Sequence, residues 1–429
     1  MGEKLGKKGI AVSTAVIITV IVTAIIVGSG VYVLKPAAGE KEVTKSCTLA
    51  IEHFSPIAGT TWSGAHDRAA KRLMEKYPTL EYVYREEIGP DLTNSTAEEL
   101  IASEGADIVV GNAEFMGLPL ADIADDYPDV YFSSIIASDL TTKRNFIRYF
   151  PGQYQALYLE GLIAGALTET NNIGIVSAFP CVQVNRRQNA FYLGIMDAAE
   201  ILDENINLYV KYAGDWYLPT DEAEIARTLI DTYNCDVITQ QTDSGAPLDV
   251  AGEKGVWFVG KDMDIVGEYG WSSTDTVAVS FDTRWEVGYE KMIKSWMAGD
   301  NNPDTILYPR MDDKIILPEP PWPGGPTVLP TVDIQNNHEV GIDAISPAAR
   351  PLIESEIISL VENRRTQMMS GVWDPFFAHE FVSNGTGLEL ESVSIPTAGT
   401  VVKSANETPT DEWLLSKFNF DLEGINILE

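Results

Sequence analysis

Two stretches of this sequence share one pattern. GADIVVGNAEF (105–115) leads to PDVYFSS (128–134), and NCDVITQQTDS (234–244) leads to KGVWFVG (254–260). In each pair a short apolar run follows an acidic residue, ends in polar residues, and is followed by a helical segment and a second apolar run. Such alternation predicts parallel strands with helices on both faces of a sheet.

The same alternation extends in both directions. Apolar runs at 47–54 and 80–86 precede the first pair, and runs at 172–179 and 207–213 precede the second. We therefore predict an α/β protein with two similar Rossmann-like lobes. Lobe 1 is expected to contain residues 47–168 and about 268–300, and lobe 2 residues 169–267 and about 331–429. The proline-rich stretch 317–330 is predicted to be a loop, because its six prolines preclude a regular helix.

Composition excludes several classes of protein. The 429 residues carry a net charge of −33, which disfavours nucleic acid as a partner. Hydrophobic residues make up 45%, so disorder is not expected. Three cysteines are too few for a disulfide scaffold, and four scattered histidines without an HExxH motif argue against a zinc enzyme.

The N-terminal segment indicates a membrane anchor. Residues 10–34 contain no charge and would form ~37 Å of helix, enough to cross a bilayer. Lysines in the basic leader 1–9 favour a cytoplasmic start, which places the chain beyond a tether at 35–46 outside the cell. KKGIAVST (7–14) resembles an archaeal pilin-type signal cleaved after Gly9. Retention of the anchor and complete removal as a signal both remain open.

Ligands of open parallel sheets bind beyond the carboxyl ends of the strands. Trp62 lies in the first such loop and Trp216 in an equivalent loop of the second series, so the two indoles could hold a flat ring. They could equally be aromatics that pack the edges of the lobes. Asp243, Asp262 and Asp264 also follow strands and could accept hydrogen bonds from a ribose or a base.

These acidic residues have other interpretations. Asp243 could cap a helix, and Asp262, Asp264 and Glu268 could form a metal site, although a DxD motif alone is weak. His66 and Asp67 could form a catalytic pair, but no nucleophile elbow accompanies them, so we expect a structural role. No GxGxxG motif is present, so no dinucleotide cofactor is expected, and no cofactor or metal is predicted.

Several segments, in order, match one known family. TTWSGAHDRAAKRL (60–73), GDWYLPTDE (214–222), QQTDSGAP (240–247) and VGKDMD (259–264) resemble motifs of the basic membrane protein family. Its members are ABC-transporter substrate-binding proteins similar to purine nucleoside receptors. The resemblance covers roughly residues 47–429, with only 317–330 looking inserted.

This resemblance implies a type I periplasmic-binding-protein fold, whose two lobes close about a hinge on a purine nucleoside or purine base. The family's stacking aromatics correspond to Trp62 and Trp216, and its acidic contacts to Asp262 and Asp243. Phe115 corresponds to an aromatic of the family in the loop after ADIVVG (106–111). The remaining candidate ligand-binding residues are Phe179, Asp264 and Gln155. Gln155 stands where the family often has Glu, and Lys261 replaces an apolar or small residue, which leaves the ligand's identity open.

Three functions are compatible with these features. The first is a membrane-anchored extracellular receptor that delivers a purine-type solute to an ABC permease, whose ATPase subunits supply energy because this chain has no GxxxxGK[ST] motif. The second is a surface sensor or adhesin on the same fold. The third, a nucleoside-cleaving enzyme, is disfavoured because HFSPIAGTTW (53–62) contains no acidic residue.

Overall fold

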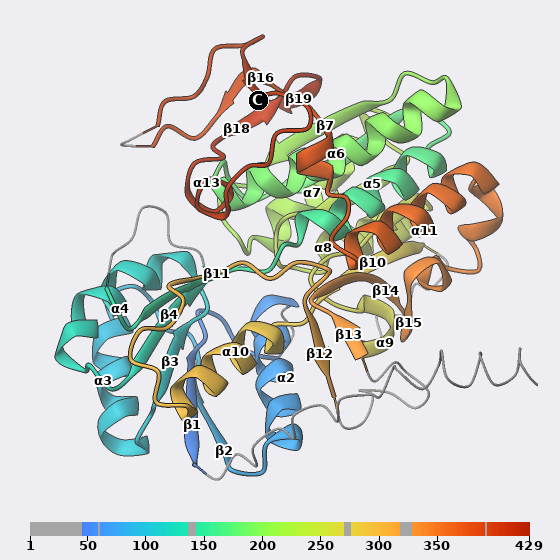
Figure 1. Ribbon diagram of the computed structural model, residues 1–429. Helices are drawn as coiled ribbons and strands as arrows, with labels where there is room; N and C mark the ends of the chain where they lie inside the picture. The colour runs from blue at the N-terminus through green and yellow to red at the C-terminus, as the bar shows by residue number, and fades with distance from the viewer. Residues whose placement is uncertain (1–44, 59–60, 136–142, 270–275, 318–327, 391–392) are drawn as a thin grey trace, which may run out of the picture. The chain divides into compact units, whose positions relative to one another are not determined.

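The computed structural model describes residues 45–58, 61–135, 143–269, 276–317, 328–390 and 393–429 (Figure 1). The predicted leader 1–9, the apolar segment 10–34 and nearly all of the tether therefore lie outside the described residues. Within the described part, no helix has both the length and the apolar character needed to cross a membrane.

The first sheet contains six strands in the order β11-β5-β4-β3-β1-β2, and all its neighbours are parallel. Its strands are β1 (Cys47–Glu52), β2 (Leu80–Arg85), β3 (Ile108–Gly111), β4 (Tyr131–Ile135), β5 (Phe146–Tyr149) and β11 (Ile306–Leu307). Its helical segments are α2 (Thr61–Lys76), α3 (Thr93–Glu104), η1 (Glu114–Met116), α4 (Gly117–Ile123), η2 (Ala124–Asp126) and α10 (Glu286–Met297). We call this body lobe 1; its core includes Val109, Leu120 and Phe132.

The second sheet contains eight strands in the order β15-β14-β10-β9-β8-β6-β7-β19. Its strands are β6 (Asn172–Ser177), β7 (Asn207–Tyr212), β8 (Val237–Gln240), β9 (Trp257–Val259), β10 (Val277–Thr283), β14 (Val332–Asn336), β15 (Glu339–Val340) and β19 (Ile425–Leu428). Within the described sheet the pairs β10–β14 and β14–β15 are antiparallel, and the other neighbouring strands are parallel. We call this sheet and its helices lobe 2.

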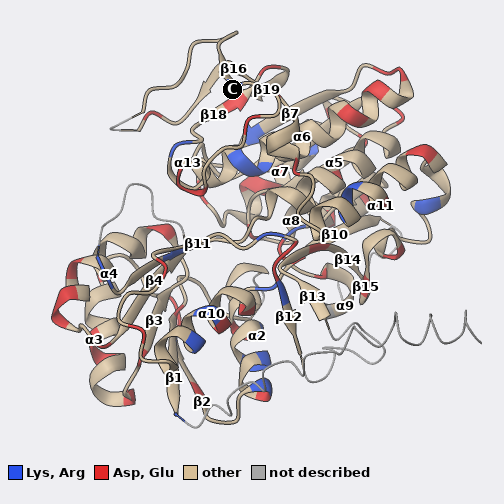
Figure 2. Cartoon of the chain, viewed as in Figure 1, with Lys and Arg blue, Asp and Glu red and all other residues tan. Residues whose placement is uncertain are grey.

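The helices of lobe 2 come from widely separated parts of the chain. They are α5 (Tyr154–Leu167), α6 (Val182–Leu202), α7 (Pro219–Asp231), α8 (Ala246–Lys254), α9 (Ile265–Tyr269) and α11 (Ser355–Met369), with the short turns η3 (Gly341–Ala344) and η4 (Arg350–Leu352) before α11. Acidic residues are drawn on helices of both lobes, among them α3 and α11 (Figure 2), in keeping with the negative net charge.

The division between the lobes differs from the expected one in two places. Residues 277–283 were expected in lobe 1, but as β10 they pair with β9 in the second sheet, and only the following α10 packs on α2. Helix α5 was also expected in lobe 1, but it packs against α6, α11 and β14. The chain therefore crosses between lobes after β5, after β10 and after β11 (Figure 1).

Glycines explain why α5 belongs to lobe 2. A Cβ on Gly161 of α5 would lie 2.1 Å from the backbone oxygen of Phe191, and a Cβ on Gly194 of α6 would lie 2.1 Å from that of Tyr158. Only glycine at both positions lets the two backbones approach this closely. The α5–α6 contact is the most extensive in the described chain.

The remaining segments flank lobe 2 and the lobe crossings. A small sheet has the order β17-β16-β18, formed by β16 (Phe381–Gly387), β17 (Val401–Lys403) and β18 (Phe420–Leu422), with α12 (Pro375–Ala378) and α13 (Asp411–Ser416) beside it. Strands β12 (Lys314–Ile316) and β13 (Val328–Pro330) form an antiparallel pair. The predicted loop 317–330 thus includes a strand at its end, while residues 318–327 lie outside the described part.

Candidate functional site

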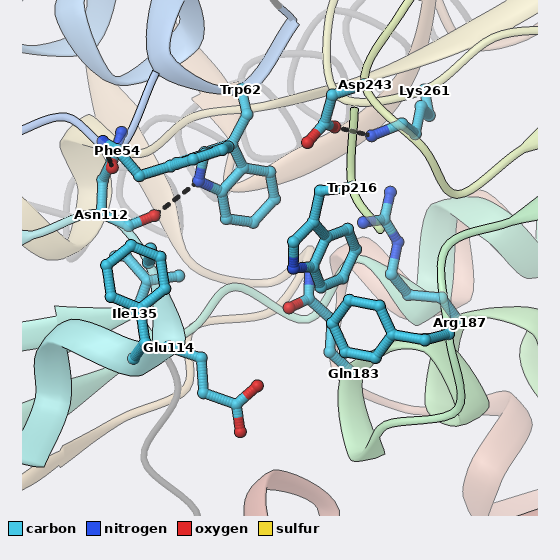
Figure 3. Close-up of a pocket in the computed structure, with 13 residues that line it drawn as sticks. Phe54, Trp62, Asn112, Glu114, Ile135, Gln183, Arg187, Trp216, Asp243 and Lys261 are labelled. Carbon is cyan, nitrogen blue, oxygen red and sulfur yellow. Dashed lines mark hydrogen bonds and ion pairs between the residues drawn. The ribbon is translucent and has the colours of Figure 1, made fainter. Parts of the chain in front are cut away.

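A cavity of about 320 Å³ is lined by residues of both lobes (Figure 3). This volume falls in the range of pockets that bind small molecules. The lobe 1 residues come from the segments after β1 and β3, from the end of β4 and from α2. The lobe 2 residues come from the loops after β6, β7, β8 and β9 and from α6. Together they are Phe54, Trp62, Asn112, Ala113, Glu114, Phe115, Ile135, Phe179, Gln183, Arg187, Trp216, Asp243 and Lys261.

Trp62 forms a rigid part of the lobe 1 wall. It lies in the first turn of α2 and is 6% exposed. Its Nε1 donates to the backbone oxygen of Asn112 (2.7 Å), and its ring contacts those of His66 and Trp285 at centroid distances of 5.4 and 5.1 Å. These contacts fix the orientation of the indole before any ligand arrives.

Trp216 lies opposite, in the loop between β7 and α7, and is half-buried. Its ring meets that of Phe179 edge-on, with centroids 5.0 Å apart. Its backbone oxygen accepts a hydrogen bond from the amide of Asp243 (2.8 Å), which joins two cavity loops of lobe 2. Figure 3 shows the two indoles at one cavity. We call Trp62 and Trp216 the indole pair.

Two cations and two carboxyl groups, all buried, form a cluster at the lobe 2 side of the cavity. Lys261 Nζ donates to Asp243 Oδ1 (2.6 Å) and to Asp262 Oδ2 (2.7 Å), and Arg187 Nη2 donates to Asp262 Oδ1 (2.9 Å). All four are at most 4% exposed. Asp262 also accepts from Gln153 Nε2 (3.2 Å), at the crossing from β5 to α5. We call Asp243, Lys261, Asp262 and Arg187 the charged cluster.

The charged cluster separates the pKa values of its two carboxyl groups. Burial by itself raises the pKa of Asp262, but Arg187 and Lys261 outweigh it, so this pKa lies below its ordinary value. Burial raises the pKa of Asp243 despite the nearby Lys261. Asp262 is thus the fixed anion that holds the two cations, and Asp243 is the carboxyl group that lines the cavity.

The structure brings most of the predicted site residues together. The indole pair, Phe115, Phe179 and Asp243 line the cavity, and Asp262 lies behind it in contact with Lys261 and Arg187. Asp243 does not cap α8, whose N-cap is Gly245 without a side-chain hydrogen bond.

Two predicted residues lie away from this cavity. Asp264 accepts hydrogen bonds from the backbone amides of Gly267, Asn337 and His338 and so fixes loops around β14. Gln155 donates to Asp374 (2.8 Å) and accepts from the amide of Met311 (2.8 Å), near the crossing that follows β11. Both therefore have structural partners of their own.

The alternative metal and catalytic sites gain no support from these contacts. Among the described residues, no group of three or more His, Cys, Asp and Glu side chains could hold a metal ion; the side chain of Glu268 lies outside the described part. His66 contacts Tyr289 through Nδ1 (2.5 Å) and stacks on Trp285 (4.0 Å). The three cysteines are buried and unpaired.

Gln183 and Arg187 are among the lining residues that sequence reasoning missed. Both lie within the first two turns of α6, on a segment that otherwise has the character of a buried helix. A signal was available, because two adjacent arginines in a helix with buried neighbours require partners. The missing information was which loop would supply those partners.

Comparison with known proteins agrees with this architecture. A family model described as "ABC transporter substrate-binding protein PnrA-like" matches residues 49–317. A putative ABC transporter glucose-binding protein of Haloferax volcanii is 34% identical over 218 residues, covering 51% of this chain and 54% of that protein. A purine-binding protein of Brucella abortus is 27% identical over 236 residues, covering 55% and 65%. The chain thus spans about half the length of the first relative and somewhat less than two thirds of the second. Both are named as proteins that bind a small solute.

Solved structures show the same fold. An ABC transporter solute-binding protein of Aeropyrum pernix has a TM-score of 0.60 at 14% identity, covering 76% of this chain and 92% of that one. One from Conexibacter woesei has a TM-score of 0.55 at 20% identity, covering 77% and 98%. The expected α/β fold with parallel sheets, like that of periplasmic binding proteins, is confirmed.

Proposed function

Because this chain belongs to the family of PnrA-like ABC transporter substrate-binding proteins, we propose that it captures a purine nucleoside or purine base between its lobes. The captured solute is then delivered to an ABC permease. The observation that carries this proposal is the indole pair, one aromatic from each lobe on one cavity. A planar heterocycle is the kind of ligand that two indoles can hold by stacking.

The distribution of the lining residues suggests how capture is coupled to delivery. A ligand that touches both Trp62 and Trp216 binds a closed arrangement of the lobes better than an open one, so it shifts the population toward closure. The crossings after β5, β10 and β11 are the natural hinge. Gln153, which joins one crossing to Asp262, links that hinge to the charged cluster.

The proposed location is the outer face of the cell membrane. The uncharged segment 10–34 and the lysines before it support an anchor with the binding lobes outside. The permease and its ATPase subunits are the proposed partners, and the net charge of −33 argues against nucleic acid.

A thermal-shift series on the full-length protein in mild detergent tests the ligand. Inosine, guanosine, adenosine and adenine are each added at increasing concentration, with glucose as a comparison. A ligand that binds only the folded state raises the melting temperature by mass action. We expect at least one purine to do so, and a flat response to all purines would remove the ligand assignment while leaving the family unchanged.

A sugar is the second candidate ligand. It is favoured by the relative named as a putative glucose-binding protein and by the charged cluster, since a hydroxyl group can donate to Asp243 and accept from Lys261. Stabilisation by glucose but by no purine would establish this alternative. Release of free base from a nucleoside incubated with the protein would instead indicate an enzyme, and binding without an associated permease would favour a sensor or adhesin.

A further inference from the structure

Arg187 has hydrogen-bonding capacity that the protein itself does not use. It is 1% exposed and lines the cavity, next to Trp216 in Figure 3. Its Nη2 donates to Asp262, but Nε and Nη1 have no hydrogen-bond partner among the residues that the structure describes. Because a buried donor without a partner is costly, we expect the ligand to supply the missing acceptors.

The guanidinium is held in a fixed orientation. Its partner Asp262 is itself fixed by hydrogen bonds from Lys261 (2.7 Å) and Gln153 (3.2 Å). Arginine can only donate, and its donors lie in one plane. The group facing Arg187 must therefore be an acceptor in a defined direction, and a donor at that place would be repelled.

The charge balance restricts the kind of acceptor. Arg187 and Lys261 are matched by Asp243 and Asp262, so the charged cluster has no excess positive charge to offer a phosphate. The cavity wall beyond the cluster is largely aromatic and aliphatic, with Phe54, Ile135 and Phe179 among its residues. A neutral heterocycle with carbonyl or ring-nitrogen acceptors fits these surroundings better than an anion.

We propose that Arg187 is a specificity-determining residue that reads the O6 and N7 acceptors of a 6-oxopurine. This inference rests on the proposed function. Hypoxanthine and guanine present two neighbouring acceptors on this edge, the pair to which arginine donates in other recognition sites. Adenine presents an amino donor beside N7, which would face the donors of Arg187. Inosine and guanosine are therefore the preferred ligands, and adenosine is disfavoured.

Titration calorimetry on the unmodified full-length protein tests the preference directly. Inosine and adenosine share the ribose and the purine ring and differ in the group at position 6 and in the proton on N1. Inosine is expected to bind about 10- to 100-fold more tightly. 7-Deazainosine, which lacks the N7 acceptor, is expected to bind about 10-fold more weakly than inosine. Adenosine binding as tightly as inosine would overturn the inference and leave the proposed function standing. If neither a purine nucleoside nor a purine base binds, the proposed function fails and the inference fails with it.

A variant identifies the residue responsible. Arg187→Lys keeps a positive charge beside Asp262 but loses the planar set of donors, so the inosine-to-adenosine ratio should fall to within about threefold of unity. Arg227→Lys is the matched control, because Arg227 lies on α7, is exposed and pairs with Glu253. An unchanged ratio in folded Arg187→Lys would refute the role of Arg187. If that variant does not fold, the three nucleosides on the unmodified protein still decide the preference.

Discussion

Replacing Trp216 by alanine should weaken purine binding without unfolding the protein. Stacking of a base on an aromatic side chain contributes about 1–3 kcal/mol by alanine substitution. Trp216→Ala is therefore expected to raise Kd roughly 5- to 150-fold. Trp216 is only half-buried, and its interaction with the amide of Asp243 uses the backbone, which the substitution keeps. The cost to the free energy of unfolding should stay at about 1 kcal/mol.

Trp216 is a better position for this test than Trp62. Trp62 is buried against His66 and Trp285 and donates to Asn112, so Trp62→Ala should cost about 3–5 kcal/mol of stability. A loss of binding in that variant would be difficult to separate from a loss of folding.

The assay is titration calorimetry with the tightest-binding purine, at one salt concentration, on the parent and three variants. Trp216→Phe keeps an aromatic face and should retain most of the affinity. Tyr217→Ala is the matched control, since Tyr217 is the neighbouring aromatic, is 50% exposed and does not line the cavity. Binding by Trp216→Ala within twofold of the parent would refute stacking on this indole, as would an equal loss in Tyr217→Ala.

Three further predictions concern stability. Gly161→Ala should lower the free energy of unfolding by about 1–3 kcal/mol in urea titrations, because its Cβ would lie 2.1 Å from the backbone oxygen of Phe191. Lys261→Met should cost about 3–5 kcal/mol in the same assay, since it leaves two buried carboxylates near each other; an unchanged midpoint would contradict the charged cluster. Burial raises the pKa of Glu52 to about 9, so its contribution to stability is fully present below the unfolded pKa and is lost as pH rises toward 9. Glu52→Gln should abolish that loss, worth up to about 1.4 kcal/mol per pH unit, and parallel curves for parent and variant between pH 6 and pH 9 would disprove it.

The alternation of short apolar runs with helical segments was sufficient to predict the strands whose following loops contribute to the site. β3 and β8 lie within the two segments that define the repeat, and the predicted residues after them, Phe115 and Asp243, line the cavity. This succeeds because parallel sheets bring the carboxyl ends of their strands together whatever the connections are. The resemblance to the basic membrane protein family is likewise confirmed by the family model over 49–317.

Contacts between distant segments were not predictable in the same way. β10 belongs to lobe 2 because it pairs with β9. α5 belongs to lobe 2 because Gly161 lets it approach α6 closely. Neither partner is indicated by the periodicity of the segment itself. Arg187 was missed for the same reason, since its importance depends on Asp262, 75 residues away in the sequence.

A crystal structure of the full-length protein grown with inosine would test the central claim most directly. We predict planar density between the indoles of Trp62 and Trp216, with an acceptor of the ring within hydrogen-bond distance of Arg187. Density for inosine anywhere else, or a ring in contact with only one of the two indoles, would contradict the account.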